Sequence, residues 1–263
     1  VPMELYLKGV VPSEIVPSWK PDAIKAQAVA ARTYAVYHKN GYRSAGYDIT
    51  DDTRSQVYRG CSVETSATNK AVEETAGEII TYNGKAIDAL FHANGGGYTE
   101  DSENVWGSYV PYLRGVKEES SSTVNRPWHK IVSIDSFSNA ISRAGYHVGK
   151  VKKIGLSRLH MGNNRAKDRG ISGRVKTMEI TGKSGRKIIP GEVIQSAFDL
   201  DSTLFDISAK GNNLIITGYG FGHGLGLSQW GAEAMAEKNG DGKEYYKRIL
   251  LHYFTGSKIE KIY

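Results

Sequence analysis

The residue best suited to do chemistry is Glu14, which lies in the segment PSEIVP between two prolines at positions 12 and 17. Proline fixes φ and disfavours helical backbone at the residue before it. We therefore expect a stiff turn that holds the carboxylate in a fixed direction. A glutamate whose pKa is raised by burial can act as a general acid and base. An ordinary surface glutamate is the alternative that the turn leaves open.

Two cations follow on the alanine-rich stretch after Glu14. Lys25 and Arg32 are seven residues apart, which at about 100° per residue places them on one side of a helix. We expect this helix to begin near Pro21, a favourable first-turn residue, and to end near Gly41. The two cations could bind a charged ligand beside the glutamate. Two solvated surface side chains are the alternative.

Other catalytic chemistries have weaker support in the sequence. The histidines at 92, 129, 160 and 223 form neither an HxxxH nor an HExxH pattern, although His92 and His223 each adjoin a glycine run and could meet in the fold. A serine hydrolase of the GxSxG type is not indicated, because that motif is absent. Cys61 is the single cysteine, so an internal disulfide and a cysteine-rich zinc site are excluded. We expect a buried structural thiol there.

Two glycine-rich stretches indicate special backbone geometry. Gly95–Gly97 follow a predicted strand, and glycine recurs at nearly every second position from 218 to 226. Such glycines are costly unless the backbone adopts positive φ or lies close against another group. No GK[ST] follows the first run, so a phosphate loop is not indicated.

The composition is that of a globular protein with a sizeable core: 263 residues, 40% hydrophobic, 24% charged and a net charge of +6. This charge suits an anionic polymer. The basic residues are scattered and no nucleic-acid motif occurs, so we expect no nucleic-acid partner. No stretch reaches the roughly 20 apolar residues that span a bilayer. Because the chain begins at Val1 without an initiator methionine, we expect a targeting segment to precede it.

The helices and strands expected around these residues indicate an α+β fold. A hairpin is expected at Asn83-Gly84, the strongest short turn signal for two antiparallel strands. Residues 47–60 should form a turn-rich loop ending in a short strand, and residues 99–128 a polar loop. Further helices are expected at 65–76, 135–145, 193–200, 232–239 and within 240–256, and strands at 77–83, 85–94, 151–159, 173–183, 186–193 and 204–220.

We expect one catalytic domain over residues 1–263, with a weak boundary near residue 130. Residues 1–130 and 217–263 would form a groove, and residues 131–216 a strand-rich lobe.

Several stretches of the chain resemble, in order, the stage II sporulation protein D family, which also contains amidase enhancers. They include VVPSEIVPSWKPDAIKAQAVAARTYAVY from residue 10, SQVYRG from 55, FHANGGGYTEDSENVWG from 91, PYLRGV from 111 and GFGHGLGLSQWGAEAMA from 220. The middle of the chain, with SGRVKTMEI and DLDSTLFDI, also fits. The resemblance therefore covers nearly the whole sequence.

The resemblance implies a lytic transglycosylase that cuts peptidoglycan strands stripped of stem peptides between N-acetylmuramic acid and N-acetylglucosamine, leaving a 1,6-anhydro end. The family's catalytic acid is the glutamate of its PSE motif, here Glu14, and its functional lysine and arginine match Lys25 and Arg32. One carboxylate can suffice, because the C6 hydroxyl of the substrate acts as the nucleophile, whereas hydrolysing glycosidases usually use two carboxylates.

The same resemblance suggests that the glycine runs line a glycan groove, with Tyr98, Tyr219 and Trp230 as sugar-stacking candidates. The candidate substrate-binding residues are Lys25, Gln27, Arg32, His92, Gly95, Gly96, Tyr98, Gly222, His223 and Gln229.

Some family members carry a zinc site in the region of residues 48–61. Here that region offers three aspartates and a single cysteine. We therefore expect no metal or other cofactor, and a polar, hydrogen-bonded loop instead.

The family also implies a location on the cell-wall side of the membrane, an N-terminal anchor and a role in engulfment during sporulation. The implied partners are peptidoglycan glycan strands, a cell-wall amidase and membrane sporulation proteins. A non-catalytic glycan-binding protein that stimulates an amidase is the competing interpretation.

Overall fold

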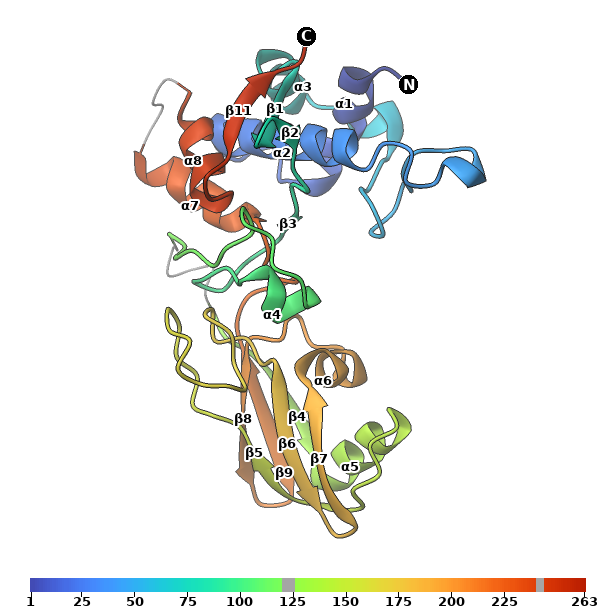
Figure 1. Cartoon of the computed structure of the whole chain (residues 1–263), viewed down its shortest axis with the longest axis vertical. Helices are drawn as coiled ribbons and strands as arrows, with labels where there is room; N and C mark the ends of the chain where they lie inside the picture. Colours follow the sequence, from blue (N-terminus) through green and yellow to red (C-terminus); the bar gives the residue numbers. More distant parts are fainter. Residues whose placement is uncertain (120–125, 240–243) are drawn as a thin grey trace. The chain divides into compact units, whose positions relative to one another are not determined.

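The computed structural model describes residues 1–119, 126–239 and 244–263 (Figure 1). Helices and antiparallel strands are mixed along the chain, which confirms the α+β prediction. Contacts divide the chain into two compact units. Unit 1 consists of Val1–Phe91, Pro111–Arg114 and Gly226–Tyr263, and unit 2 of His92–Val110 and Gly115–Leu225. No helix in the described residues is long and apolar enough to cross a membrane.

Unit 1 is built around helix α2 (Pro21–Tyr37), as expected from the alanine-rich sequence. It contacts α1 (Met3–Glu14), α3 (Ser66–Glu74), α7 (Gln229–Asn239), α8 (Tyr245–Tyr253) and strand β1 (Glu78–Tyr82). Ala23, Ala26, Ala28, Ala30 and Ala31 are fully buried. Their small side chains let neighbouring elements approach the helix axis on several sides, so α2 can form the centre of the unit.

A three-stranded antiparallel sheet in the order β11–β1–β2 completes unit 1, with β11 at Lys258–Lys261 and β2 at Lys85–Ala86. The Asn83-Gly84 hairpin is confirmed: Tyr82 pairs with Lys85, and both turn residues have positive φ. The second strand is shorter than predicted. After Ala86 the Asp88 N–H donates to the Tyr112 hydroxyl at 3.1 Å instead of to a strand.

The remaining short elements are the two-residue strands β3 (Phe91–His92) and β10 (Leu227–Ser228) and the 3₁₀ turns η1 (Arg43–Ala45) and η2 (Gly60–Val63).

Three further local predictions in unit 1 are wrong: the turn at Glu14, the burial of Cys61 and the short strand at the end of loop 47–60. Helix α1 continues through Pro12 to Glu14, so the glutamate ends a helix rather than occupying a proline-bracketed turn. Pro12 has no N–H to offer the Lys8 carbonyl, but the helical hydrogen bonding resumes after it, since the Ile15 N–H donates to the Val11 carbonyl at 3.0 Å. Cys61, expected to be buried, is exposed on η2.

The short strand predicted at the end of loop 47–60 is also absent from the described structure. Its backbone hydrogen bonds go to scattered partners: Val57 N–H to the Glu14 carboxylate, Tyr58 N–H to the Asp51 carbonyl and Arg59 N–H to the Gly9 carbonyl. No neighbouring strand is therefore needed to satisfy this segment.

Unit 2 contains two three-stranded antiparallel sheets. One has the order β4 (Trp128–Ser133), β9 (Asn213–Gly218), β8 (Phe205–Lys210), and the other the order β5 (Val151–Gly155), β6 (Thr177–Gly182), β7 (Gly185–Pro190). The tight turns after Gly182 and Lys210 were predicted; β4 was not.

Helices α5 (Ile134–Arg143) and α6 (Gly191–Phe198), both expected from the sequence, contribute to the core of unit 2. Phe137 of α5 stacks on Phe198 of α6 with ring centroids 4.9 Å apart. Met178, Ile180 and Ile216 bring the sheets into the same buried cluster.

Within the segment predicted as a loop over residues 99–128, a short helix, α4 (Ser102–Trp106), is present; residues 120–125 lie outside the described structure. The predicted helix within 240–256 is present as α8, and residues 240–243 lie outside the described structure.

The glycine runs have the geometry that the sequence predicted. Gly96, Gly220, Gly222 and Gly224 have positive φ. A Cβ on Gly96 would lie 2.7 Å from the Leu204 side chain and 3.1 Å from the Gly220 nitrogen. The two runs thus fold against each other within unit 2, at distances that leave no room for a side chain.

Candidate functional site

Glu14 stands at the last position of α1, half-buried in unit 1. Its Oε1 accepts a hydrogen bond from the Val57 N–H at 2.9 Å. Burial raises the pKa of Glu14, and the Val57 hydrogen bond offsets only part of that rise. A carboxyl group with a raised pKa can hold a proton nearer neutral pH and give it to a leaving group.

Gln56, which sequence analysis did not single out, fixes the loop that carries Val57. Its side chain is fully buried. The Tyr6 hydroxyl donates to Gln56 Oε1 at 3.0 Å, and Gln56 Nε2 donates to the Ala31 carbonyl at 3.1 Å. One amide thereby joins α1, α2 and the loop. Gln56 lies in the SQVYRG stretch, but no residue near it in the sequence indicates its contacts with Tyr6 and Ala31.

Two tyrosines lie in the electrostatic range of Glu14. Burial raises the pKa of Tyr6, and the charge of Glu14 adds to the rise. Burial likewise raises the pKa of Tyr34, with a smaller contribution from Glu14. Both phenols therefore remain protonated. These two neighbours of Glu14 are thus aromatic and uncharged.

Lys25 and Arg32 have separate partners, and within the described residues neither forms a hydrogen bond or ion pair with Glu14. Lys25 Nζ pairs with Glu74 Oε2 at 2.5 Å, near the surface. Arg32 is fully buried and binds Glu4 in a bidentate pair, with Nε–Oε1 at 2.9 Å and Nη2–Oε2 at 2.7 Å.

Arg32 also donates to the backbone carbonyls of Val72 and Glu78, at 3.2 and 3.1 Å. These contacts tie α1, α3 and β1 to α2. The geometry thus gives Arg32 a structural role, and any contact with substrate would require its ion pair to open.

Gln27 and Gln229, two further candidates in unit 1, lie together. Gln229 Nε2 is 3.4 Å from Gln27 Oε1, and Gln27 is fully buried. Trp230, the next residue of α7, contacts Trp19 with ring centroids 4.5 Å apart and is 39% exposed. Trp19 follows Glu14 in the turn after α1, so an aromatic surface lies in the same unit as the glutamate.

The candidates of unit 2 form a second group. The rings of His92 and His223 are 5.2 Å apart, so these residues do meet, as the glycine context suggested. His92 Nδ1 is 3.0 Å from the Leu225 carbonyl, which makes Nδ1 the donor. Burial and the neighbouring His223 hold the pKa of His92 well below its usual range, so its ring is neutral.

Gly95, Gly96, Gly222 and Tyr98 are engaged within unit 2. A Cβ on Gly95 would lie 2.6 Å from the Glu118 carboxylate, and one on Gly222 would lie 2.9 Å from the His92 Cβ. The Gly96 N–H donates to Asn94 Oδ1 at 2.8 Å, and Tyr98 bridges to Lys117 through its backbone. The close approaches of these glycines are thus to other parts of the protein.

In residues 48–61, for which the family resemblance raised the question of a zinc site, the aspartates and the cysteine have separate surroundings. Asp52 accepts hydrogen bonds from Arg54 Nη2 at 2.8 Å and from the Thr50 hydroxyl at 3.1 Å. Asp48 accepts the Asn40 N–H, and Cys61 is exposed. Across the described residues, no three His, Cys, Asp or Glu side chains are grouped closely enough to hold a metal ion. The loop is polar and hydrogen-bonded, as predicted.

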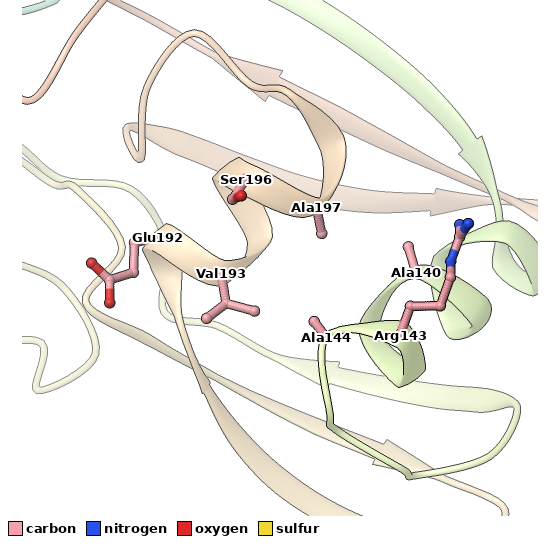
Figure 2. Close-up of a pocket in the computed structure, with 7 residues that line it drawn as sticks. All are labelled: Ala140, Arg143, Ala144, Glu192, Val193, Ser196 and Ala197. Carbon is pink, nitrogen blue, oxygen red and sulfur yellow. The ribbon is translucent and has the colours of Figure 1, made fainter. Parts of the chain in front are cut away.

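A surface hollow of about 740 Å³ lies between α5 and α6 in unit 2 (Figure 2). Ala140, Ala144, Val193 and Ala197 line most of it. Figure 2 shows the Glu192 carboxylate directed away from the hollow and from Arg143. This hollow therefore has no convergent acid and base, and it is a poor candidate for catalysis.

Comparisons with known proteins agree with the geometry of two separate units. Residues 1–82 match the family model described as Stage II sporulation protein, and residues 113–226 match a domain of unknown function. Stage II sporulation protein D of Bacillus subtilis is 33% identical over 99% of this chain and 75% of its own length.

Two other relatives differ in their descriptions. An uncharacterised protein of Brachyspira hyodysenteriae is 36% identical over 98% of this chain and 66% of its own length. An amidase enhancer of Bacillus subtilis is 32% identical over 96% of this chain and 40% of its own length. The chain thus spans two fifths to three quarters of these relatives.

Proposed function

Because the chain belongs to the stage II sporulation protein D family, we propose that it is a peptidoglycan lytic transglycosylase. Its substrate would be a glycan strand without stem peptides, cut between N-acetylmuramic acid and N-acetylglucosamine. The observation that supports this most strongly is the half-buried Glu14, whose pKa is raised by burial. A proton held on that carboxyl is what a single-acid mechanism needs.

The proposed reaction uses Glu14 twice. The protonated carboxyl first donates to the glycosidic oxygen, so that the C1–O bond breaks and N-acetylglucosamine leaves with a free 4-hydroxyl. The carboxylate then takes the proton from the C6 hydroxyl of the muramic residue as its oxygen bonds to C1. This closes the 1,6-anhydro ring and returns Glu14 to its protonated form.

The surroundings of Glu14 favour this scheme over ordinary hydrolysis. Burial raises the pKa of Glu14 against the opposing effect of the Val57 hydrogen bond, and no second carboxylate among the described residues contributes to the rise. A hydrolase that activates water or forms a glycosyl-enzyme usually has a second carboxylate within about 5–10 Å. With the substrate's own hydroxyl as nucleophile, that partner is not needed.

A second candidate function is a non-catalytic glycan-binding protein that stimulates a cell-wall amidase. The relative described as an amidase enhancer favours it. Both candidates place the protein on the cell-wall side of the membrane, with glycan strands, a cell-wall amidase and membrane sporulation proteins as partners. Engulfment during sporulation would be the setting, and an N-terminal segment would provide the anchor.

The two candidates differ in their products. Incubation of purified protein with denuded glycan strands, followed by mass spectrometry, should reveal products ending in 1,6-anhydro-N-acetylmuramic acid. Strands that stay intact, together with faster cleavage by an added amidase on whole peptidoglycan, would favour the enhancer.

A further inference from the structure

A cavity of about 360 Å³ within unit 2 has no role in the mechanism above. It is lined by residues from three parts of the unit, among them Trp106, Arg174, Lys176, Glu192, Gln195 and His223. Most of these residues fall in the segment that matches a domain of unknown function. The volume is near the lower end for ligand pockets, roughly 300–1,000 Å³, which favours a ligand of one ring over a peptide.

One wall of the cavity is an exposed aromatic ring. Trp106 ends α4 and is 54% exposed, with its ring centroid 5.5 Å from that of His223. Gly107 follows with φ +79°, which ends the helix and leaves the indole at its end. The negative face of an indole attracts the C–H groups on the flat face of a pyranose. An exposed tryptophan at a cavity is therefore suited to a sugar ring.

The polar groups beside this ring include several without partners. Neither Lys176 nor Glu192 has a side-chain hydrogen bond or an ion pair within the described residues. Gln195 donates its Nε2–H to the Leu200 carbonyl at 3.2 Å, which leaves its amide oxygen as an acceptor. In Figure 2 the Glu192 side chain also points away from the α5–α6 hollow.

A buried arginine also lines the cavity. Arg174 is 2% exposed, and its Nη1 and Nη2 donate to the carbonyls of Gly222 and Gly95 at 3.2 and 3.3 Å. Its Nε–H has no hydrogen-bond partner in the described structure and lies against Gly224, where a Cβ would come within 2.2 Å of it. Arg174 therefore contributes positive charge to the cavity lining and holds the glycine loops in place.

Glu100, in contrast, is already occupied. Its carboxylate accepts bonds from Ser172 N–H at 3.1 Å, Ser172 hydroxyl at 2.6 Å and Ile171 N–H at 3.0 Å, as well as from Asn104 Nδ2 at 2.9 Å. It therefore fixes the loop that carries Arg174 and is not available to a ligand. The groups available to a ligand are Lys176, Glu192 and Gln195, which line the same cavity as Trp106.

We propose that this cavity of unit 2 binds one N-acetylated amino-sugar ring, stacked on Trp106 with its hydroxyl groups bonded to Glu192, Gln195 and Lys176. The identity of the polymer rests on the proposed function, but binding does not require Glu14. The cavity would then hold a residue of the glycan independently of the reacting bond.

The test uses the whole chain carrying Glu14→Gln, so that cleavage does not change the ligand. The chain has 4 tryptophans, and an ¹⁵N-labelled sample should give one indole N–H signal for each. Titration with an N-acetylglucosamine oligosaccharide should shift the Trp106 signal. The Trp128 signal should stay in place, because its Nε1–H donates to the Gly220 carbonyl at 3.1 Å outside the cavity.

Variants provide a second measure. Trp106→Ala should weaken the affinity for denuded strands about tenfold, a loss of about 1.4 kcal/mol, while Trp106→Phe should retain most of it. Tyr109→Ala is the matched control, because Tyr109 is 68% exposed in the same unit and does not line the cavity. Lys176→Ala should weaken binding severalfold, and Lys187→Ala, on exposed β7, should not.

An unmoved Trp106 signal at saturating ligand, or equal affinities for Trp106→Ala and Tyr109→Ala, would overturn the proposal. The result is separable from the proposed reaction. Anhydro products from the wild type without a Trp106 shift would contradict only this site. A Trp106 shift without anhydro products would contradict only the transglycosylase.

Discussion

At the scale of single residues, the account depends on burial. Glu14 and Arg32 are both charged residues removed from water, but their surroundings differ. The carboxylate of Glu14 has one backbone hydrogen bond and a raised pKa. Arg32 has a bidentate carboxylate and two carbonyl partners. A charge with many partners stabilises the fold, whereas one with few is poised for proton transfer.

The raised pKa of Glu14 predicts the pH dependence of stability. Its folded-state pKa lies above the unfolded value, so its favourable contribution is present at low pH and is lost as pH rises through the folded pKa. Glu14→Gln should therefore melt at an equal or higher temperature than the wild type at pH 7. The difference should vanish near pH 4. Thermal denaturation across this range measures it, and a variant that melts lower at pH 7 would contradict the assignment.

Activity should respond to the same pKa. Because the first step needs a protonated Glu14, kcat/KM should fall as pH rises through a value above the usual range for glutamate. A pH–rate profile on denuded strands measures this limb. An activity that fell instead with an ordinary glutamate pKa near 4.3 would show that burial does not tune the acid.

Arg32 and Lys25 should differ sharply when truncated. Arg32→Ala removes the cation that pairs with Glu4 and a donor to two backbone carbonyls, and should cost about 3–5 kcal/mol of unfolding free energy. Lys25→Ala removes a pair whose side chains are 21% and 41% exposed, and should cost about 1 kcal/mol or less. Urea denaturation compares them. Equal costs would contradict the structural role of Arg32, and lost activity in a stable Lys25→Ala variant would support a substrate contact.

At the scale of elements, local signals were sufficient where the structure is local. Pro21 and the alanines predicted α2, and Asn83-Gly84 predicted the hairpin, because each signal acts within a few residues. The failures involve distant partners. Arg32 is buried because Glu4 lies on another helix, and the loop carrying Val57 forms no strand because its N–H groups bond to Glu14 and Gly9.

The candidate site shows the same division. Glu14 could be identified from the sequence, but its position at the end of a helix could not, since Pro12 suggested a turn. Gln56 was missed because nothing near it in sequence reveals its bonds to Tyr6 and Ala31. Such contacts become visible only when the elements are placed together.

Gln56 provides a prediction for the loop as an element. Gln56→Ala leaves the Tyr6 hydroxyl without its acceptor, removes a donor to the Ala31 carbonyl, and should cost about 1–3 kcal/mol. Because the loop supplies the Val57 N–H, the alkaline limb of the pH–rate profile should also move to higher pH as that hydrogen bond weakens. Gln56→Glu at low pH, where the neutral acid can mimic the amide oxygen, should recover part of the activity. A stability loss with an unchanged profile would contradict the positioning role.

At the scale of the whole molecule, two units have separate relationships to known proteins. The part of unit 1 up to residue 82 matches the family model, and it contains Glu14, its loop and its tyrosines. The matched domain of unknown function lies almost wholly in unit 2, where the Trp106 cavity is found. The proposed division of labour is an acid in unit 1 and a sugar-binding cavity in unit 2.

The most direct test of the central claim is the mass of the products from denuded glycan strands treated with wild-type protein and with Glu14→Gln. The account predicts fragments ending in 1,6-anhydro-N-acetylmuramic acid from the wild type and none from the variant, with the variant folded and still binding glycan. Retained cleavage by Glu14→Gln, or wild-type products with ordinary reducing ends, would contradict it.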